Sequence, residues 1–126
     1  MNYRIILLFG LTMIVGCGGG NGPSSSQDTV LIYKSTEAVQ CGFEGFSIDD
    51  TANELIEAGV DVLLSQCGIT TGLIVATVCG AGTFDINIHE IPAQNIEDAE
   101  DLEFSQIEDL IDEEAGVGYQ TTDCND

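Results

Sequence analysis

Basic side chains are almost absent from this chain. Its 126 residues include only two, Arg4 and Lys34, against 22 aspartates and glutamates, and the formal net charge at pH 7 is −20. Proteins that bind nucleic acid neutralise its phosphates with lysine and arginine. The composition therefore excludes nucleic acid as a partner, and it also disfavours direct adsorption to anionic lipid head groups.

Histidine is equally scarce, which restricts the catalytic chemistry available to the chain. His89 is the only histidine, and a serine nucleophile needs such a base beside it. The sequence from Phe84 to His89 alternates apolar and polar residues, which predicts a strand whose apolar residues face the core and whose histidine faces solvent. No G-x-S-x-G elbow, phosphate-binding loop or EF-hand spacing is present. We predict no catalytic residues, no metal site and no cofactor.

Long hydrophobic runs are missing as well. The stretch from Ile5 to Val15 has eleven residues, whereas a membrane-spanning helix needs about 20. Its length and the preceding Arg4 suit a secretory signal peptide. The stretch ends in Ile14-Val15-Gly16-Cys17, followed by a segment rich in glycine and serine. Together these features resemble the signal peptide, lipobox and tether of bacterial lipoproteins.

The lipoprotein resemblance implies how the chain is processed and where in the cell it is located. Residues 1–16 would be cleaved off, Cys17 would carry lipid, residues 17–27 would form the lipidated cysteine and its flexible tether, and residues 28–126 would form a single domain. Gly18, in place of an aspartate, implies the outer membrane of a Gram-negative host. An ordinary signal peptide with an incidental cysteine is the alternative. Residues 40–68 and 78–92 also resemble segments of uncharacterised small exported proteobacterial proteins, to which no activity is attached.

Four further cysteines suit an exported domain. Cys41, Cys67, Cys79 and Cys124 are too widely spaced for the close cysteine pairs of a zinc site. An even number in a small exported domain predicts two disulfides. We expect Cys41–Cys67 and Cys79–Cys124, because strands predicted at 29–33 and 60–66 should run parallel through a right-handed crossover. A strand at 73–79 would then run back and carry its cysteine to the opposite end.

The hydrophobic pattern predicts an α+β domain: a small mixed sheet, in the order β-α-β-β-β-α, with helices packed on it. A capping box beginning at Ser47 starts a helix at 48–58, and Gly59 ends it. The run 73–79 would place apolar residues on both faces of a strand, as in a central strand that is covered on both sides. Helices are expected after Pro92 and, from a second capping box, after Ser105; coil follows to the C-terminus.

The segment from Glu97 to Glu114 is the most acidic part of the chain, with ten of its eighteen residues aspartate or glutamate. It could be a solvated helical face, a docking face for a basic protein, or a calcium site. The candidate interaction residues are Glu97, Asp98, Glu100, Asp101, Glu108, Asp109 and Asp112. The sequence as a whole favours a non-catalytic, lipid-anchored envelope protein that binds another protein. A small envelope enzyme or enzyme accessory using carboxylates, and a divalent-cation-binding lipoprotein, are the alternatives.

Overall fold

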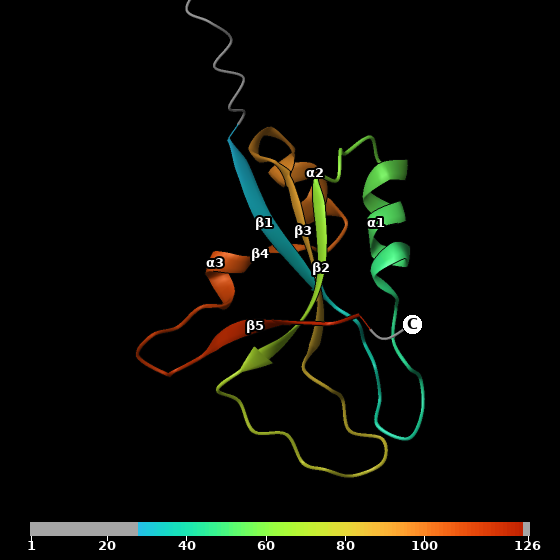
Figure 1. Cartoon of the computed structure of the whole chain (residues 1–126), viewed down its shortest axis with the longest axis vertical. Coiled ribbons are helices and arrows are strands. Elements are labelled where there is room, and N and C mark those ends of the chain that lie inside the picture. The colour runs from blue at the N-terminus through green and yellow to red at the C-terminus, as the bar shows by residue number, and fades with distance from the viewer. Residues whose placement is uncertain (1–27, 125–126) are drawn as a thin grey trace, which may run out of the picture.

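A computed structural model describes residues 28–124 and shows five strands with three helices (Figure 1). The α+β class, helices packed on the sheet and two disulfides are confirmed. In chain order the elements are β1 (Thr29–Ser35), α1 (Ile48–Glu57), β2 (Leu64–Thr71), β3 (Asp85–Pro92), the 3-10 turn η1 (Ala93–Asn95), α2 (Ile96–Asp101), β4 (Ser105–Gln106), α3 (Ile107–Leu110) and β5 (Gly118–Thr122).

The strands form one sheet in the order β4-β1-β3-β2-β5, and every neighbouring pair is antiparallel. β1 and β2 run in the same direction, as the crossover argument predicts. They do not pair, because β3 lies between them and is antiparallel to both. The sheet is therefore antiparallel throughout rather than mixed.

Strand β3 is covered on both faces. On one face Ile91 packs with Ile32 of β1, Leu55 of α1, and Ala99 and Phe104 from the α2 region. On the other face Ile86 and Ile88 pack with Ile107 of α3, and with Leu31, Tyr33, Leu110 and Tyr119 around them. The chain passes between the two faces at β4, which pairs with the outer edge of β1.

Helix α1 begins where the sequence predicts and ends at Glu57, one residue before the predicted end. The Ser47 hydroxyl accepts a hydrogen bond from the Asp50 backbone N–H at 3.1 Å, and the Asp50 carboxylate accepts one from the Ser47 N–H at 2.9 Å. Gly59 follows the helix with φ +84°, a conformation in which glycine is favoured. The second predicted capping box is wrong: Ser105 belongs to β4, and no side chain caps α3. The expected C-terminal coil contains β5, which pairs with β2.

The strand predicted at 73–79 is absent, and this is the largest correction to the sequence-based fold. Residues 72–84 form a loop between β2 and β3, and the Ile74 side chain is 98% exposed. An apolar run looks the same in sequence whether it fills a central strand or an exposed loop. The central position in this sheet is taken by β3.

The loss of that strand also changes the disulfide pairing. The bonds are Cys41–Cys79 and Cys67–Cys124, not the predicted Cys41–Cys67 and Cys79–Cys124. The 72–84 loop stays at the end of the sheet where β1 finishes, so Cys79 meets Cys41 there. Cys67 lies within β2 opposite Thr122 of β5, which places it beside Cys124.

Lys34, the only basic residue after Arg4, joins three parts of the fold. Its ammonium nitrogen lies 2.9 Å from Glu54 Oε2 on α1 and 3.0 Å from the Leu102 carbonyl oxygen. The same nitrogen lies 5.2 Å from the centre of the Phe104 ring, within range of a cation–π interaction. The domain therefore uses Lys34 internally, and no other carboxylate among residues 28–124 has a cationic partner.

Peptide mapping of the unreduced protein tests the disulfide pairing. Cleavage at acidic residues leaves Cys67 and Cys79 on one peptide, so chymotryptic cleavage after the exposed Leu73 is needed to separate them. We expect peptides linked Cys41–Cys79 and Cys67–Cys124. The two bonds span 38 and 57 residues, and loop-closure entropy assigns about 4 kcal/mol to each. Replacing either pair with serine should lower the free energy of unfolding by about that amount. A peptide linking Cys41 to Cys67 would contradict the structure.

Candidate functional site

The sequence-predicted site residues do not come together. Cys17 and the predicted signal and tether segments lie outside the described residues. The seven acidic candidates are exposed and divided between α2, α3 and Asp112 beyond α3. Because α2 packs on one face of the sheet and α3 on the other, these residues do not form one continuous helical face. Within residues 28–124, no group of three or more His, Cys, Asp or Glu side chains could hold a metal ion.

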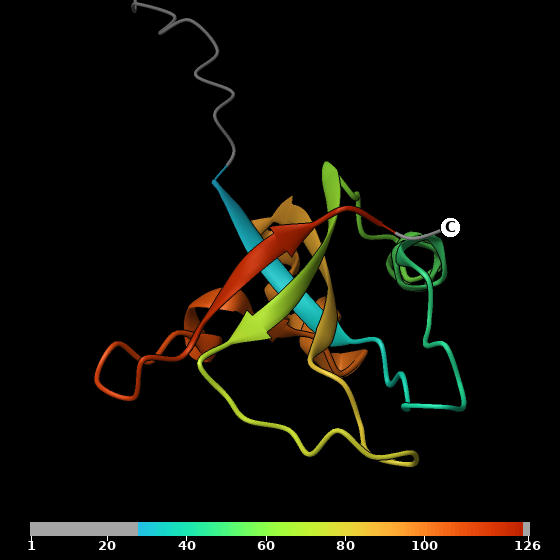
Figure 2. The ribbon, with the colours of Figure 1, turned by 60° about the horizontal axis from the view of Figure 1, so that its bottom comes forward.

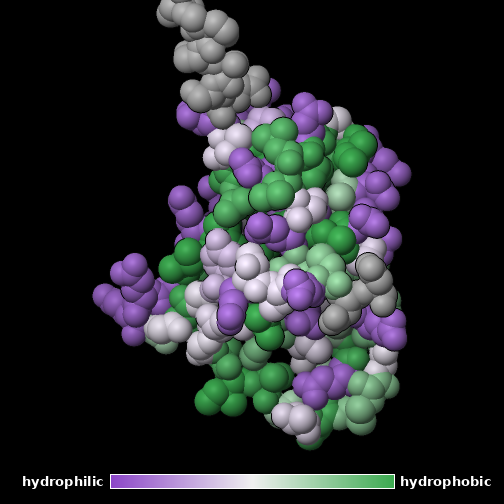
Figure 3. Space-filling view, viewed as in Figure 1, coloured by the Kyte–Doolittle hydropathy of each residue, from purple (hydrophilic) through white to green (hydrophobic). Residues whose placement is uncertain are grey.

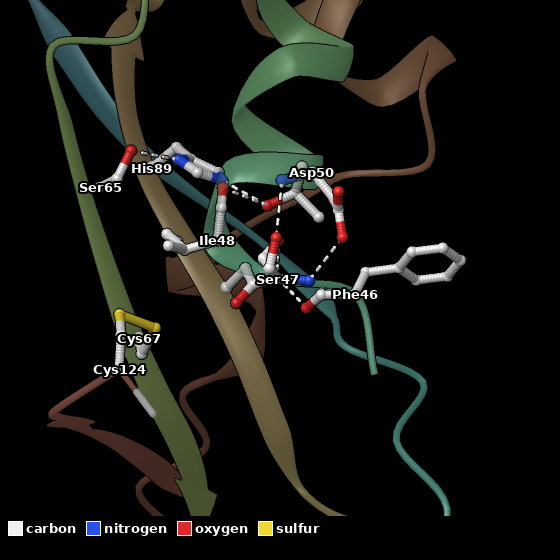
Figure 4. Close-up of a disulfide and its surroundings, with 10 residues drawn as sticks. Phe46, Ser47, Ile48, Asp50, Ser65, Cys67, His89 and Cys124 are labelled. Atoms are coloured by element: carbon white, nitrogen blue, oxygen red, sulfur yellow. Dashed lines mark hydrogen bonds between the residues drawn. A yellow bond between two sulfur atoms is a disulfide. The ribbon is translucent and has the colours of Figure 1, made fainter. Parts of the chain in front are cut away.

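His89 is buried, which corrects the prediction that it faces solvent. Its exposed fraction is 0%, because α1 covers the face of β3 that alternation assigned to water. Its Nε2 lies 2.7 Å from the Thr51 hydroxyl on α1, and its Nδ1 lies 2.8 Å from the Ser65 hydroxyl on β2 (Figure 4). The histidine thus connects a helix and two strands.

The surrounding hydrogen bonds are consistent with one arrangement of protons in this cluster. The Thr51 hydroxyl donates to the Ile48 carbonyl at 3.2 Å, so its oxygen is free to accept from His89 Nε2–H. His89 Nδ1 then accepts from the hydroxyl of Ser65, whose side chain reaches the surface. An exposed serine hydrogen-bonded to a neutral histidine is the arrangement in which a histidine base activates a serine nucleophile.

Burial makes His89 a poor base. Desolvation lowers its pKa from 6.5 to about 4, because the imidazolium would lose its hydration. The group that orients the ring is a threonine hydroxyl, not a carboxylate that could stabilise an imidazolium. We therefore interpret the cluster as a set of buried hydrogen bonds that hold α1 against the sheet.

A different surface stands out at the end of the sheet where β1 and β2 finish. Residues 62–84 contain no charged side chain, and the loop within them exposes Leu73 (48%), Ile74 (98%), Val75 (37%) and Val78 (57%). Phe43 and Phe46, from the neighbouring loop, are 50% and 39% exposed. We call these six residues the apolar tip. Figure 3 shows apolar residues gathered at the lower end of the molecule with hydrophilic residues beside them, and a second apolar patch near the upper end.

Backbone hydrogen bonds hold the two loops of the apolar tip side by side (Figure 2). The Gln40 N–H donates to the Ala81 carbonyl at 2.9 Å, and the Gly80 N–H donates to the Gln40 carbonyl at 2.9 Å. The Gln40 side-chain amide also donates to the carbonyls of Ala76 and Gly82. The Cys41–Cys79 disulfide joins the same two loops covalently.

Local backbone geometry also fixes the apolar tip. Gly72 starts its longer loop with φ +83°, and a Cβ there would overlap the carbonyl of Gly116, so only glycine fits. Cys41 has φ +62°, an uncommon conformation for a residue with a side chain. Phe43 and Phe46 pack edge to face with ring centres 5.3 Å apart. The exposed apolar side chains are therefore presented on a constrained scaffold.

A cleft adjoins the apolar tip and shares Phe46 with it. It has a volume of about 330 Å³ and lies between the start of α1 and the strands around the Cys67–Cys124 disulfide (Figure 4). Phe46, Ile48 and Ile86 are among its lining residues, although the Ile86 side chain packs with Ile107 on the opposite face of β3. Its acidic lining residues are Glu44, Asp49, Asp85 and Asp123, and all four are exposed. No basic residue lines this cleft.

Comparison with known proteins adds no assignment: the chain matches no family model, no curated protein and no solved structure. Within residues 28–124, no helix is long and apolar enough to span a bilayer. The signal for the apolar tip is present in the sequence, as a charge-free run of 23 residues, numbers 62–84, in a strongly acidic chain.

An NMR titration of the single histidine tests its burial. We expect the His89 ring signals to titrate near pH 4 rather than 6.5. Because the folded pKa lies below the unfolded one, the stabilisation from keeping this ring neutral is present above pH 6.5. It falls by about 3 kcal/mol as the pH drops from 6.5 to 4. His89→Gln should remove that part of the pH dependence of the free energy of unfolding. The part that comes from the carboxylates should be the same in both proteins. A midpoint near 6.5 would contradict the buried neutral histidine.

Proposed function

We propose that this protein is a non-catalytic, lipid-anchored protein of the cell envelope that binds another protein through the apolar tip. The observation that carries the proposal is the exposure of six large apolar side chains on two loops joined by a disulfide and backbone hydrogen bonds. Burying such side chains contributes about 25 cal/mol per Å² removed from water. Constraining them beforehand reduces the entropy lost on binding.

The sheet separates the proposed anchor from the apolar tip. Asp28 enters β1 beside Pro92, at one end of β3, whereas the loops of the tip leave β1 and β2 near Asp85 at the other end. Eight residues of extended strand span about 27 Å. With lipid on Cys17 and a tether reaching roughly 17 Å, the tip is presented on the side of the domain away from its attachment.

The charge distribution favours a protein partner over a bilayer or a second copy. A formal charge of −20 repels anionic lipid head groups, and the 72–84 loop has no lysine or arginine to attract them. Two copies would repel one another for the same reason. A protein with an apolar surface of its own can cover the tip without either penalty.

The lipid anchor is tested by the intact mass of protein extracted from membranes. We expect loss of residues 1–16 and the added mass of acyl chains on Cys17. Cys17→Ser should lack the acyl mass and leave the membrane fraction, while the folded domain stays unchanged. Unmodified Cys17 or retained residues 1–16 in the mature protein would contradict the anchor.

Photo-crosslinking from position 74 tests the apolar tip in intact cells, with position 64 as the control. Leu64, at the opposite end of β2, is 46% exposed, close to the 48% of Leu73. We expect one discrete protein adduct from position 74 only. Excess wild-type protein and the Leu64→Ser variant should compete it away, whereas Leu73→Ser should compete at least about fivefold less well, because a buried apolar contact is lost.

The stability of these variants separates binding from folding. Leu73→Ser and Leu64→Ser should lower the free energy of unfolding by similar amounts, about 1 kcal/mol each, since about half of each side chain is exposed. An adduct with lipid or with a second copy of this chain, or equal competition by both variants, would overturn the proposed function.

A further inference from the structure

We infer that the partner adds an extended strand of its own to the outer edge of β5, so that the sheet of this domain continues into the partner. The inference rests on the proposed function, because it takes the protein that covers the apolar tip as the occupant and specifies how its backbone docks.

The outer edge of β5 presents backbone hydrogen-bonding groups. In an antiparallel pair, successive residues direct their N–H and C=O groups alternately toward and away from the neighbouring strand. The Thr70 N–H donates to the Phe84 carbonyl at 2.9 Å, so Thr70 faces β3 and not Tyr119, which lies opposite it in β5. By alternation Gln120 faces β2, whereas Tyr119 and Thr121 direct their N–H and C=O groups outward.

A tight turn before β5 supports this direction and shows what the edge accepts. Val117, immediately before β5, exchanges both backbone hydrogen bonds with Asp112, at 2.9 and 3.0 Å. An extended residue of the chain itself thus pairs with the outer side at one position. Among residues 28–124, no strand or bridge continues that pairing along Tyr119 and Thr121. A strand from another chain can continue it.

The two edges of the sheet are protected unequally. Native proteins protect edge strands with charged side chains, with proline or by keeping the strands very short. At one edge β4 has only two residues, and α3 follows it directly. At the other edge lies β5 (Figure 2), where residues 115–122 contain neither a charged side chain nor proline. In a chain with 22 acidic residues, this uncharged edge is open to pairing.

An extended strand of a partner fits this edge better than a second copy of the chain. Outward N–H and C=O groups on alternate residues match another extended backbone, as in peptide recognition by strand addition. A second copy would bring its own charge of −20 to the interface. β5 begins opposite Thr71, and the preceding Gly116 lies against Gly72, where the longer loop of the tip starts. The edge therefore begins beside the tip, and one partner can cover both.

Hydrogen exchange at single-residue resolution tests the edge in the mature lipidated protein, held in zwitterionic nanodiscs. Relative to their rates in an unstructured chain, we expect the N–H groups of Tyr119 and Thr121 to exchange at least about tenfold faster than that of Gln120. Equal protection of the three groups would show that the edge is already covered, and would overturn the inference.

A synthetic peptide tests strand addition to the same sample. It has about ten residues, alternates threonine and valine, and carries a lysine at each end. The matched control has the same sequence and charge but N-methyl groups on two adjacent central residues, which remove one donor from each edge of the peptide. Fluorescence anisotropy should show at least about tenfold weaker binding of the control. The unmethylated peptide should also slow exchange at Tyr119 and Thr121. Equal binding of the two peptides, or binding of neither, would contradict strand addition.

Variants at position 121 connect the edge to the partner. Thr121→Pro removes the outward N–H, at a position where an edge strand tolerates proline, whereas Thr121→Val changes only the side chain. We expect Thr121→Pro to weaken the unmethylated peptide about fivefold or more. It should also compete at least about threefold less well than Thr121→Val for the protein adduct formed from position 74. Protection of the Gln120 N–H checks that β5 stays paired with β2, and the N-methylated peptide tests the same contact without altering the protein.

The outcomes distinguish the inference from the proposed function. Equal competition by the two variants for the adduct would show that the partner does not use the edge, and would leave the tip as the docking surface. Leu73→Ser should leave the affinity of the synthetic peptide unchanged; a loss of binding in that variant would place the peptide on the tip and overturn strand addition. Absence of a protein adduct from position 74 would overturn the proposed function, while the peptide results would still decide whether β5 accepts a strand.

Discussion

Coverage of both faces of β3 is the constraint on which the rest of this structure depends. Each face has its own apolar cluster, one reaching α1 and α2 and the other reaching α3 and Tyr119. A strand in that position must also satisfy its polar side chains without water. Asn87 does so by donating to backbone carbonyls, and His89 does so with the hydroxyls of Thr51 and Ser65. The neutral histidine is therefore a consequence of packing.

The same constraint accounts for the apolar tip. With β3 in the centre of the sheet, the more apolar run at 73–79 has no place in the core and projects from the end of the sheet. Exposed apolar loops of this size carry a cost in solubility. In this chain the cost is offset by a charge of −20 distributed over the remaining surface. The Cys41–Cys79 disulfide restrains the loops, so that the exposed side chains keep a defined arrangement.

These features together suit a surface that awaits a partner. The exposed loops lie far from the end of the domain where the chain enters from the proposed lipid anchor. Apolar contact between these loops and a partner would provide affinity. The buried histidine and the internal Lys34 network stabilise this arrangement from within.

The sequence by itself determined the α+β class, the capped helix at α1, the presence of two disulfides and the strand at β3, because these depend on local periodicity, capping residues and composition. Tertiary structure alone decided which apolar run occupies the centre of the sheet. Alternation in β3 and continuous hydrophobicity at 73–79 are each compatible with burial, and only competition for one central position separates them. That decision buried His89, exposed Ile74 and brought Cys79 to Cys41 in place of Cys124. Pairing and exposure depend on contacts between residues far apart in the chain, which local pattern does not encode.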